Sequence, residues 1–212
     1  MLHDRGYNTK EENVMSLEDF VLKFERREKL TQLVYSKDEN STSKNIQPDI
    51  SDIMVSYITA TNKGGSVGKD QFKEFLVQLE TKGITNGIII SNSLSAEVKK
   101  SISQIEDKTR IRFFKESHLY FPIVYHRLQP GFNLVTPDIL TYIEKFQVRK
   151  EGETDEEVIA QLPFRFPQML DSDPVAIYYD YRVGDLILTD RKPYLRVVTQ
   201  TIEIPKKKKE KK

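Results

Sequence analysis

The sequence has no cysteine and only three histidines among its 212 residues. Without cysteine, neither a disulfide framework nor a cysteine-ligated zinc site can form. His3, His118 and His126 are far apart in the sequence, and no carboxylates accompany them at a spacing typical of metal ligands. We therefore expect no metal site and no cofactor.

Long apolar runs are also missing. No stretch approaches the roughly 20 apolar residues of a membrane-spanning helix, and the first residues, "MLHDRGYNTKEE", lack the apolar core of a signal peptide. We expect a soluble, intracellular protein. Its 38% apolar and 31% charged residues are typical of globular proteins. The length suffices for one large domain or two small ones.

Charge is distributed unevenly along the chain. The net charge is +1, but the last seven residues, "KKKKEKK", carry +5, so residues 1–205 carry −4. An acidic body argues against a free-standing nucleic-acid binder. We expect residues 205–212 to be a disordered, lysine-rich tail. Such a tail could improve solubility, contact nucleic acid or an acidic partner, or direct nuclear import.

The first half of the chain predicts alternating helices and strands. Apolar residues at helical spacing predict a helix over residues 17–28, with Ser16 as its cap. After a polar loop, β-branched and aromatic residues in "DIMVSYITA" predict a strand. The elements expected next are a helix with Phe72, Phe75, Leu76 and Leu79 on its apolar side, a buried strand in "ITNGIIIS", a helix capped by Ser95, and a strand in "TRIRFF". Right-handed crossovers would make part of this α/β sheet parallel.

The pattern changes near Pro122, where we place a boundary between two domains, residues 1–123 and 124–204. The second domain is expected to be small and mixed α+β. Its expected elements are a strand and turn in "IVYHRLQPGFN", a helix starting at Thr136-Pro137, a capping box from Thr154 to Glu157, a helix capped by Asp173 with Pro174 first, a turn at Gly184, and strands in "DLILT" and "YLRVVTQTI".

The segment "NKGGSVGKDQF" lies between an expected strand and an expected helix, as a phosphate-binding P-loop does. That motif requires four residues between its glycines and a hydroxyl residue after its lysine. Here three residues separate Gly64 from Gly68, and Asp70 follows Lys69. The spacing therefore favours a turn over a nucleotide site.

A metal-dependent nuclease is a second alternative. Its chemistry needs an acidic residue before one strand and an acid-x-lysine triplet on the next, holding magnesium. Asp49 precedes an expected strand, but the triplets Glu80-Thr81-Lys82 and Glu97-Val98-Lys99 both fall on expected helices. These positions argue against an active nuclease site.

Three stretches resemble the fifth subunit shared by eukaryotic-type DNA-directed RNA polymerases. Residues 4–7, Asp-Arg-Gly-Tyr, and residues 16–20, Ser-Leu-Glu-Asp-Phe, resemble the beginning of that family. His126, Leu128 and Pro130 resemble its entry to the C-terminal domain. The C-terminal signature is matched by Leu162, Pro163, Asp173, Pro174, Val175, Ala176, Tyr178, Tyr179, Gly184 and Asp185. The order and spacing agree over residues 2–200.

The resemblance implies a non-catalytic polymerase subunit with two domains. The N-terminal domain would be a jaw with a nuclease-like α/β fold beside downstream DNA. The C-terminal assembly domain would be similar to a small subunit of archaeal RNA polymerases and dock on the largest subunit. The docking residues implied are His126, Pro130, Pro163, Asp173, Pro174, Val175, Ala176, Tyr178 and Gly184; the residues near DNA would be Ser93, Ser95 and Lys99.

The chain departs from the family pattern in several places. Residues 93–96, Ser-Leu-Ser-Ala, replace a family T-P-S-A turn near DNA, and the lysine tail has no family counterpart. In contrast, "SVGKDQF" aligns with a family segment that leads into the jaw helix, where Lys69 would meet DNA phosphate. The departures favour a divergent lineage, viral or protist. The expected place of action is the nucleus, or a virion or cytoplasmic viral factory. The alternatives left open are a metal-dependent nuclease and a stand-alone DNA-binding module.

Overall fold

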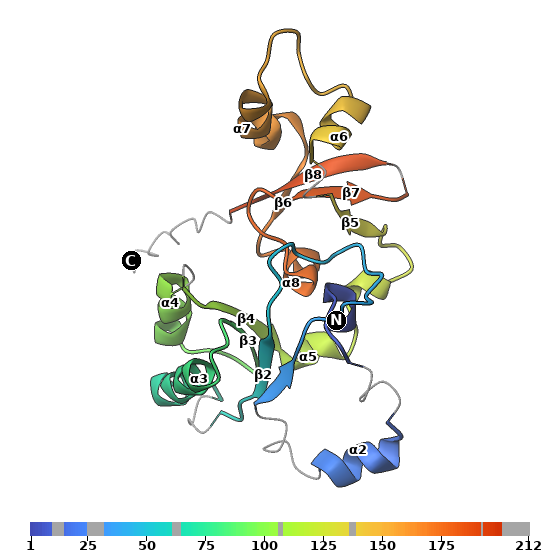
Figure 1. The fold of residues 1–212 in the computed structure, drawn as a ribbon. Helices are drawn as coiled ribbons and strands as arrows, with labels where there is room; N and C mark the ends of the chain where they lie inside the picture. Colours follow the sequence, from blue (N-terminus) through green and yellow to red (C-terminus); the bar gives the residue numbers. More distant parts are fainter. Residues whose placement is uncertain are drawn as a thin grey trace, which may run out of the picture. The chain divides into compact units, whose positions relative to one another are not determined.

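The chain folds into two compact units, Met1–His126 and Arg127–Lys212, in a computed structural model. The structure describes residues 1–9, 15–24, 32–60, 65–105, 108–135, 139–191 and 193–200. Each unit contains a four-stranded sheet with helices (Figure 1). The expected combination of an α/β unit with a smaller mixed unit is confirmed. Among the described residues, no helix has the length and apolar character needed to cross a membrane.

The sheet of the first unit has the order β1-β2-β3-β4. Strand β2 pairs in parallel with β3, and β3 in parallel with β4, whereas β1 is antiparallel to β2. The strands are β1 (Leu33–Tyr35), β2 (Ile53–Tyr57), β3 (Asn86–Ser91) and β4 (Arg110–Lys115). The predicted partly parallel sheet is confirmed, and β3 is central and buried as expected. Strand β1 was not predicted.

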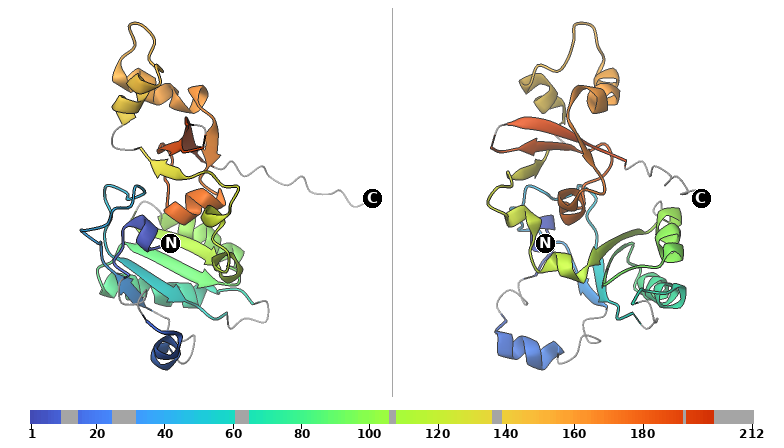
Figure 2. Two further views of the ribbon diagram at one scale, coloured as in Figure 1. Left: turned by 90° about the vertical axis from the view of Figure 1, so that its right-hand side faces the viewer. Right: turned by 180° about the vertical axis from the view of Figure 1, so that it is seen from behind.

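Helices α3 (Lys69–Thr81) and α4 (Ala96–Ile105) lie on one face of this sheet (Figures 1 and 2). The crossovers from β2 to β3 and from β3 to β4 both move one strand further in the same direction across the sheet. Because such crossovers are right-handed, they place both helices on the same side. The core between helices and sheet includes Met54, Ile89 and Ile111 from the strands and Phe72, Phe75, Leu79 and Val98 from the helices. The expected ends are present: the Ser95 hydroxyl accepts from the backbone N–H of Val98, and Gly83 has a φ of 66° after α3.

The N-terminal turn is held by contacts from distant parts of the first unit. Residues His3–Arg5 form a short 3-10 helix that ends at Gly6, where φ is 89° and a side chain would collide with Ile46. The guanidinium of the buried Arg5 lies 5.6 Å from the centre of the Phe114 ring. The hydroxyl of Tyr125 donates to the Asp4 carboxylate at 2.6 Å. The Asp-Arg-Gly-Tyr motif therefore has a structural role in closing this unit.

The sheet of the second unit has the order β5-β7-β8-β6. Its strands are β5 (Phe132–Leu134), β6 (Gln168–Leu170), β7 (Leu186–Thr189) and β8 (Tyr194–Thr199), and only β6 and β8 pair in parallel. Its helices are α6 (Ile139–Lys145), α7 (Asp155–Arg165) and α8 (Pro174–Tyr179). Its core contains Ile143, Val158, Leu162, Leu186, Leu195 and Val197.

The remaining predictions have mixed outcomes. Helix α2 (Leu17–Phe24) is present, and the backbone N–H of Asp19 donates to the Ser16 hydroxyl at 3.1 Å. The capping box of α7 is confirmed, since Thr154 and Glu157 exchange two hydrogen bonds. The prediction of a strand near residue 123 is wrong, because Ile123–Tyr125 is a 3-10 helix and the strand begins at Phe132. Strand β6 was not predicted. Residues 25–28, Gly64, Thr136-Pro137 and the lysine tail lie outside the described residues.

Candidate functional site

Helix α8 is fixed at both ends by local hydrogen bonds. The Asp173 carboxylate accepts from the backbone N–H of Val175 at 2.8 Å, and Pro174 is the first helical residue, where its missing N–H costs nothing. Asp180 ends the helix in the left-handed conformation, with a φ of 61°. This arrangement agrees with the sequence prediction for the segment.

The turn after α8 connects the helix to strands β7 and β8. The Asp185 carboxylate accepts from the backbone N–H of Arg182 at 2.8 Å. Gly184, with a φ of 95°, donates its N–H to the Val198 carbonyl at 2.9 Å. Tyr181 is completely buried, and burial raises the pKa of its phenol, so it stays neutral. The turn is thus anchored to β8.

Burial separates the docking residues implied by the resemblance into two groups. Val175, Ala176 and Tyr178 are buried, so their side chains contribute to folding. Pro174 and Gly184 are exposed, and Asp173 is half-buried. A partner can reach only the second group. These residues lie at the beginning of α8 and in the turn that follows it.

The other three implied docking residues are spread over the chain. His126 is the last residue of the first unit and is exposed. Pro130 is half-buried in the segment before β5. Pro163 lies inside α7 and is also half-buried; its carbonyl accepts from the side chain of Gln168 at 2.9 Å. No single element brings these three residues together with α8.

Sequence reasoning missed the exposed apolar side chains of the second unit. Phe164 of α7 is 87% exposed, and Val183, in the turn after α8, is 59% exposed. Ile159 and Leu170 are also exposed. One signal was available: Val158 and Leu162 form the buried stripe of α7 at i and i+4, which leaves Ile159 and Phe164 off that stripe. Single exposed apolar side chains are common on protein surfaces, and only contiguous patches of them mark interaction sites.

The residues expected near DNA lie at the beginning of α4. The Ser93 hydroxyl donates to the Gly65 carbonyl at 3.1 Å, and Ser95 caps α4. Both hydroxyls therefore have roles within the fold. Lys99 is exposed on the second turn of α4.

The triplets considered for a nuclease lie on helices, as predicted. Glu80 and Lys82 are at the end of α3, and Glu97 and Lys99 are in α4, whereas β3, "NGIIIS", has neither a carboxylate nor a lysine. Within the part of the chain that the structure describes, no group of three metal-ligating side chains occurs.

An ion pair between Arg165 and Glu153 joins α7 to the loop before it. The guanidinium donates to both carboxylate oxygens and to the Val148 carbonyl, and the backbone N–H of Lys150 also donates to Glu153. The Arg165 hydrogen bonds, followed by that of the Lys150 N–H, lower the pKa of Glu153 to about 2.

This shift predicts a dependence of stability on pH. Because the folded-state pKa of Glu153 lies below its usual value, the ion pair stabilises the fold above that usual value and is lost as pH falls toward about 2. We expect Glu153→Gln to lower the melting temperature modestly at pH 7, since the pair is partly solvated. The difference from wild type should disappear as pH falls to 2. Thermal unfolding measured between pH 7 and pH 2 checks this.

The matched control is Glu151→Gln, which removes the same charge from the same exposed loop. It should leave the pH profile of wild type unchanged. A difference between Glu153→Gln and wild type that stays constant down to pH 2 would contradict the assignment.

No family model matches the chain. A putative DNA-directed RNA polymerase subunit of Invertebrate iridescent virus 6 is 32% identical over 100 residues, which is 47% of this chain and 52% of that protein. The chain thus spans about half the length of this relative. A DNA-directed RNA polymerase subunit 5-like protein of Arabidopsis thaliana is 25% identical over 190 residues, which is 88% of this chain and 81% of that protein.

Proposed function

We propose that the protein is a subunit of a multisubunit DNA-directed RNA polymerase and acts in transcription. The observation that carries the proposal is the similarity to the Arabidopsis subunit 5-like protein, which extends over 88% of the chain and therefore over both compact units. The viral relative with a polymerase-subunit name supports the same role.

We assign the subunit a non-catalytic role, in which the second unit docks on the largest polymerase subunit. Support comes from the α8 segment. Asp173 caps the helix, Pro174 begins its first turn, and Gly184 lies in the turn before β7. The exposed Val183 lies in the same turn. A rigid turn with an exposed apolar side chain can bind a protein surface without losing much conformational freedom.

We assign the first unit a supporting role beside downstream DNA. Lys99 is exposed on α4, and Ser93 and Ser95 lie in the segment before that helix. A contact between the Lys99 ammonium group and a phosphate would help to position a duplex without reading its sequence. The protein would act where its polymerase acts, in the nucleus or, for a viral enzyme, in a virion or cytoplasmic viral factory.

Affinity purification of the tagged full-length chain from its native cells tests the proposal. We expect the largest polymerase subunit, identified by mass spectrometry, to be recovered with the wild-type chain. Val183→Asp places a charge in the docking turn and should reduce this recovery by about tenfold or more, because an unpaired charge in an apolar interface costs several kcal/mol.

The matched control is Val77→Asp. Val77 lies on α3 of the first unit and is 59% exposed, the same fraction as Val183. This variant should recover the largest subunit as wild type does. Failure of the folded wild-type chain to recover any polymerase subunit would overturn the polymerase proposal. Equal recovery by both variants would overturn the docking surface alone.

A further inference from the structure

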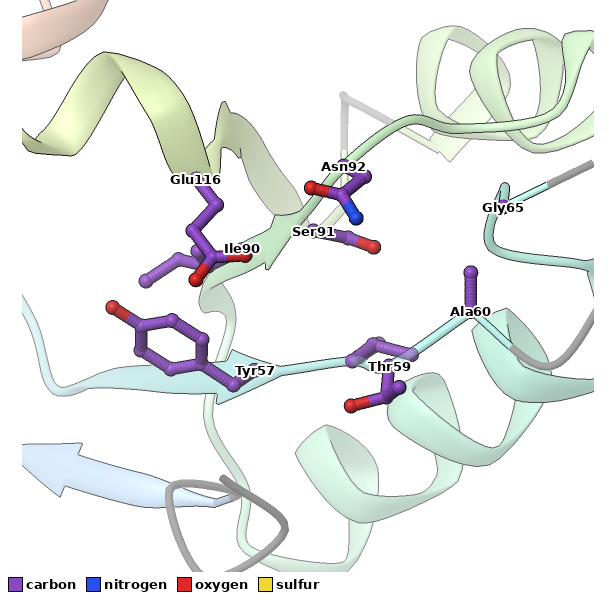
Figure 3. Close-up of a pocket in the computed structure, with 9 residues that line it drawn as sticks. Tyr57, Thr59, Ala60, Gly65, Ile90, Ser91, Asn92 and Glu116 are labelled. Atoms are coloured by element: carbon purple, nitrogen blue, oxygen red, sulfur yellow. The ribbon is translucent and has the colours of Figure 1, made fainter. Parts of the chain in front are cut away.

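A pocket of about 100 Å³ lies at the carboxyl ends of β2 and β3 in the first unit (Figure 3). Its lining comes from the ends of these strands, from Gly65 before α3, and from Glu116 after β4. Because β2, β3 and β4 are adjacent in chain order, this end of the sheet has no topological switch point, the place where open sheets bind ligands. The side chains of the lining therefore decide what the pocket can bind.

The strand register brings an aromatic ring and a carboxylate to the same face of the sheet. Tyr57 is paired with Ile90, and Ile90 with Phe114. Because side chains alternate along a strand, these three residues share one face, opposite to α3 and α4. Glu116 follows two residues after Phe114. Figure 3 shows its carboxylate beside Ile90 and facing the side of the pocket where the Tyr57 ring lies.

The walls of the pocket are held by hydrogen bonds. The Gln71 side chain donates to the Thr59 carbonyl at 2.9 Å and accepts from the Gly68 N–H at 3.3 Å. On the other side, the Ser93 hydroxyl donates to the Gly65 carbonyl. These bonds fix two of the segments that line the pocket, so little order has to be gained when a ligand enters.

The chemistry of the lining favours a small cation. Glu116 is the charged residue among the lining residues, and Ser91 and Asn92 contribute a hydroxyl and an amide. Among the described residues that line the pocket, none is a lysine, arginine or histidine, which disfavours phosphates. The volume of about 100 Å³ lies below the range of about 300–1,000 Å³ that is typical of small-molecule sites, so the group that binds is small.

A guanidinium group matches these features better than an ammonium group. It is planar, it can pair with both oxygens of a carboxylate, and it stacks on aromatic faces. We propose that the pocket binds the guanidinium group of an arginine side chain supplied by another polypeptide, with Glu116 as the ion-pair partner and the Tyr57 ring as the apolar wall. This site is separate from the docking turn of the second unit.

Titration of the purified full-length chain with capped arginine, N-acetyl-arginine methylamide, tests the proposal. We expect saturable shifts of the backbone amide signals of Ser91, Asn92 and Glu116 in NMR spectra. The neutral analogue, capped citrulline, should bind at least about tenfold more weakly than capped arginine, because it lacks the charge-assisted hydrogen bonds. Free arginine is the second ligand to be titrated. It has the same guanidinium group as capped arginine, but its amino and carboxylate groups are charged.

Glu116→Gln should reduce binding of capped arginine to the citrulline level. The hydroxyl of Tyr120 donates to the Glu116 carboxylate at 3.4 Å, and glutamine keeps an acceptor for it. Tyr57→Leu is the second variant, which keeps the carboxylate and removes the ring; it should also weaken binding. Unchanged signals outside the pocket show that each variant is folded.

Equal shifts with capped arginine and capped citrulline would overturn the proposal. Shifts that Glu116→Gln and Tyr57→Leu leave unchanged would overturn it as well, because the cation would then bind elsewhere. Binding of free arginine without binding of capped arginine would overturn the polypeptide source. None of these results depends on recovery of a polymerase subunit, so the two proposals can fail separately.

Discussion

Gly87→Ala is expected to destabilise the first unit by about 1–3 kcal/mol, the usual cost of forcing an extra methyl group into a packed core. Gly87 is a β3 residue on the face covered by α3. A Cβ atom there would lie 2.8 Å from Cζ of Phe75 and 3.2 Å from Cδ1 of Leu79. Both neighbours are buried core residues, so α3 would have to move away from the sheet. Native-state hydrogen exchange of the β2 and β3 amides measures the effect.

The double variant Gly87→Ala/Phe75→Leu separates this collision from other effects of the methyl group. Leucine lacks the Cζ and Cε1 atoms that lie nearest to the new Cβ. The cost of Gly87→Ala should therefore be smaller in the Phe75→Leu background than in wild type. Equal costs in both backgrounds would show that contact with Phe75 is not the cause.

Leu162→Ala is expected to destabilise the second unit by about 2–5 kcal/mol, as large-to-small substitutions in cores do. Leu162 of α7 is 2% exposed and packs in the core with Ile143, Leu186 and Leu195. The exchange protection of the β7 and β8 amides should fall accordingly. Protection in β2 and β3 should change little, because the cores of the two units share no residue.

Phe164→Ala, two residues further along the same helix, is the matched control. This side chain is 87% exposed, so its removal should change stability by no more than about 0.5 kcal/mol. A cost as large as that of Leu162→Ala would contradict the assignment of the buried stripe.

Much of the first unit could be predicted because its elements carry long, regular patterns. Strand β3 is a continuous apolar run between a helix end and a polar turn, and α3 repeats apolar residues at helical spacing. The short strands β1 and β6 could not be predicted. Each has three residues, too few to show alternation, and each is an edge strand fixed by pairing with a distant partner.

The candidate site could be predicted only in part. The cap at Asp173 and the turn at Gly184 follow from local chemistry, since a carboxylate before Pro174 and a glycine before a strand have clear conformational preferences. The burial of Val175, Ala176 and Tyr178 depends on tertiary packing, which a resemblance does not specify. The pocket was not predicted either, because Tyr57, Asn92 and Glu116 come from three separate segments that only the sheet register brings together.

The position of β8 in the sheet has a consequence for the order of folding. This last described strand pairs with β7 on one side and with β6 on the other. During synthesis, neither the β6 edge nor the full sheet of the second unit can form until Thr199 has left the ribosome. In contrast, the first unit can close once Tyr125 reaches Asp4. We therefore expect the first unit to fold while the chain is still being made, and the second unit to fold as a slower, final step, since its sheet depends on pairings between distant residues.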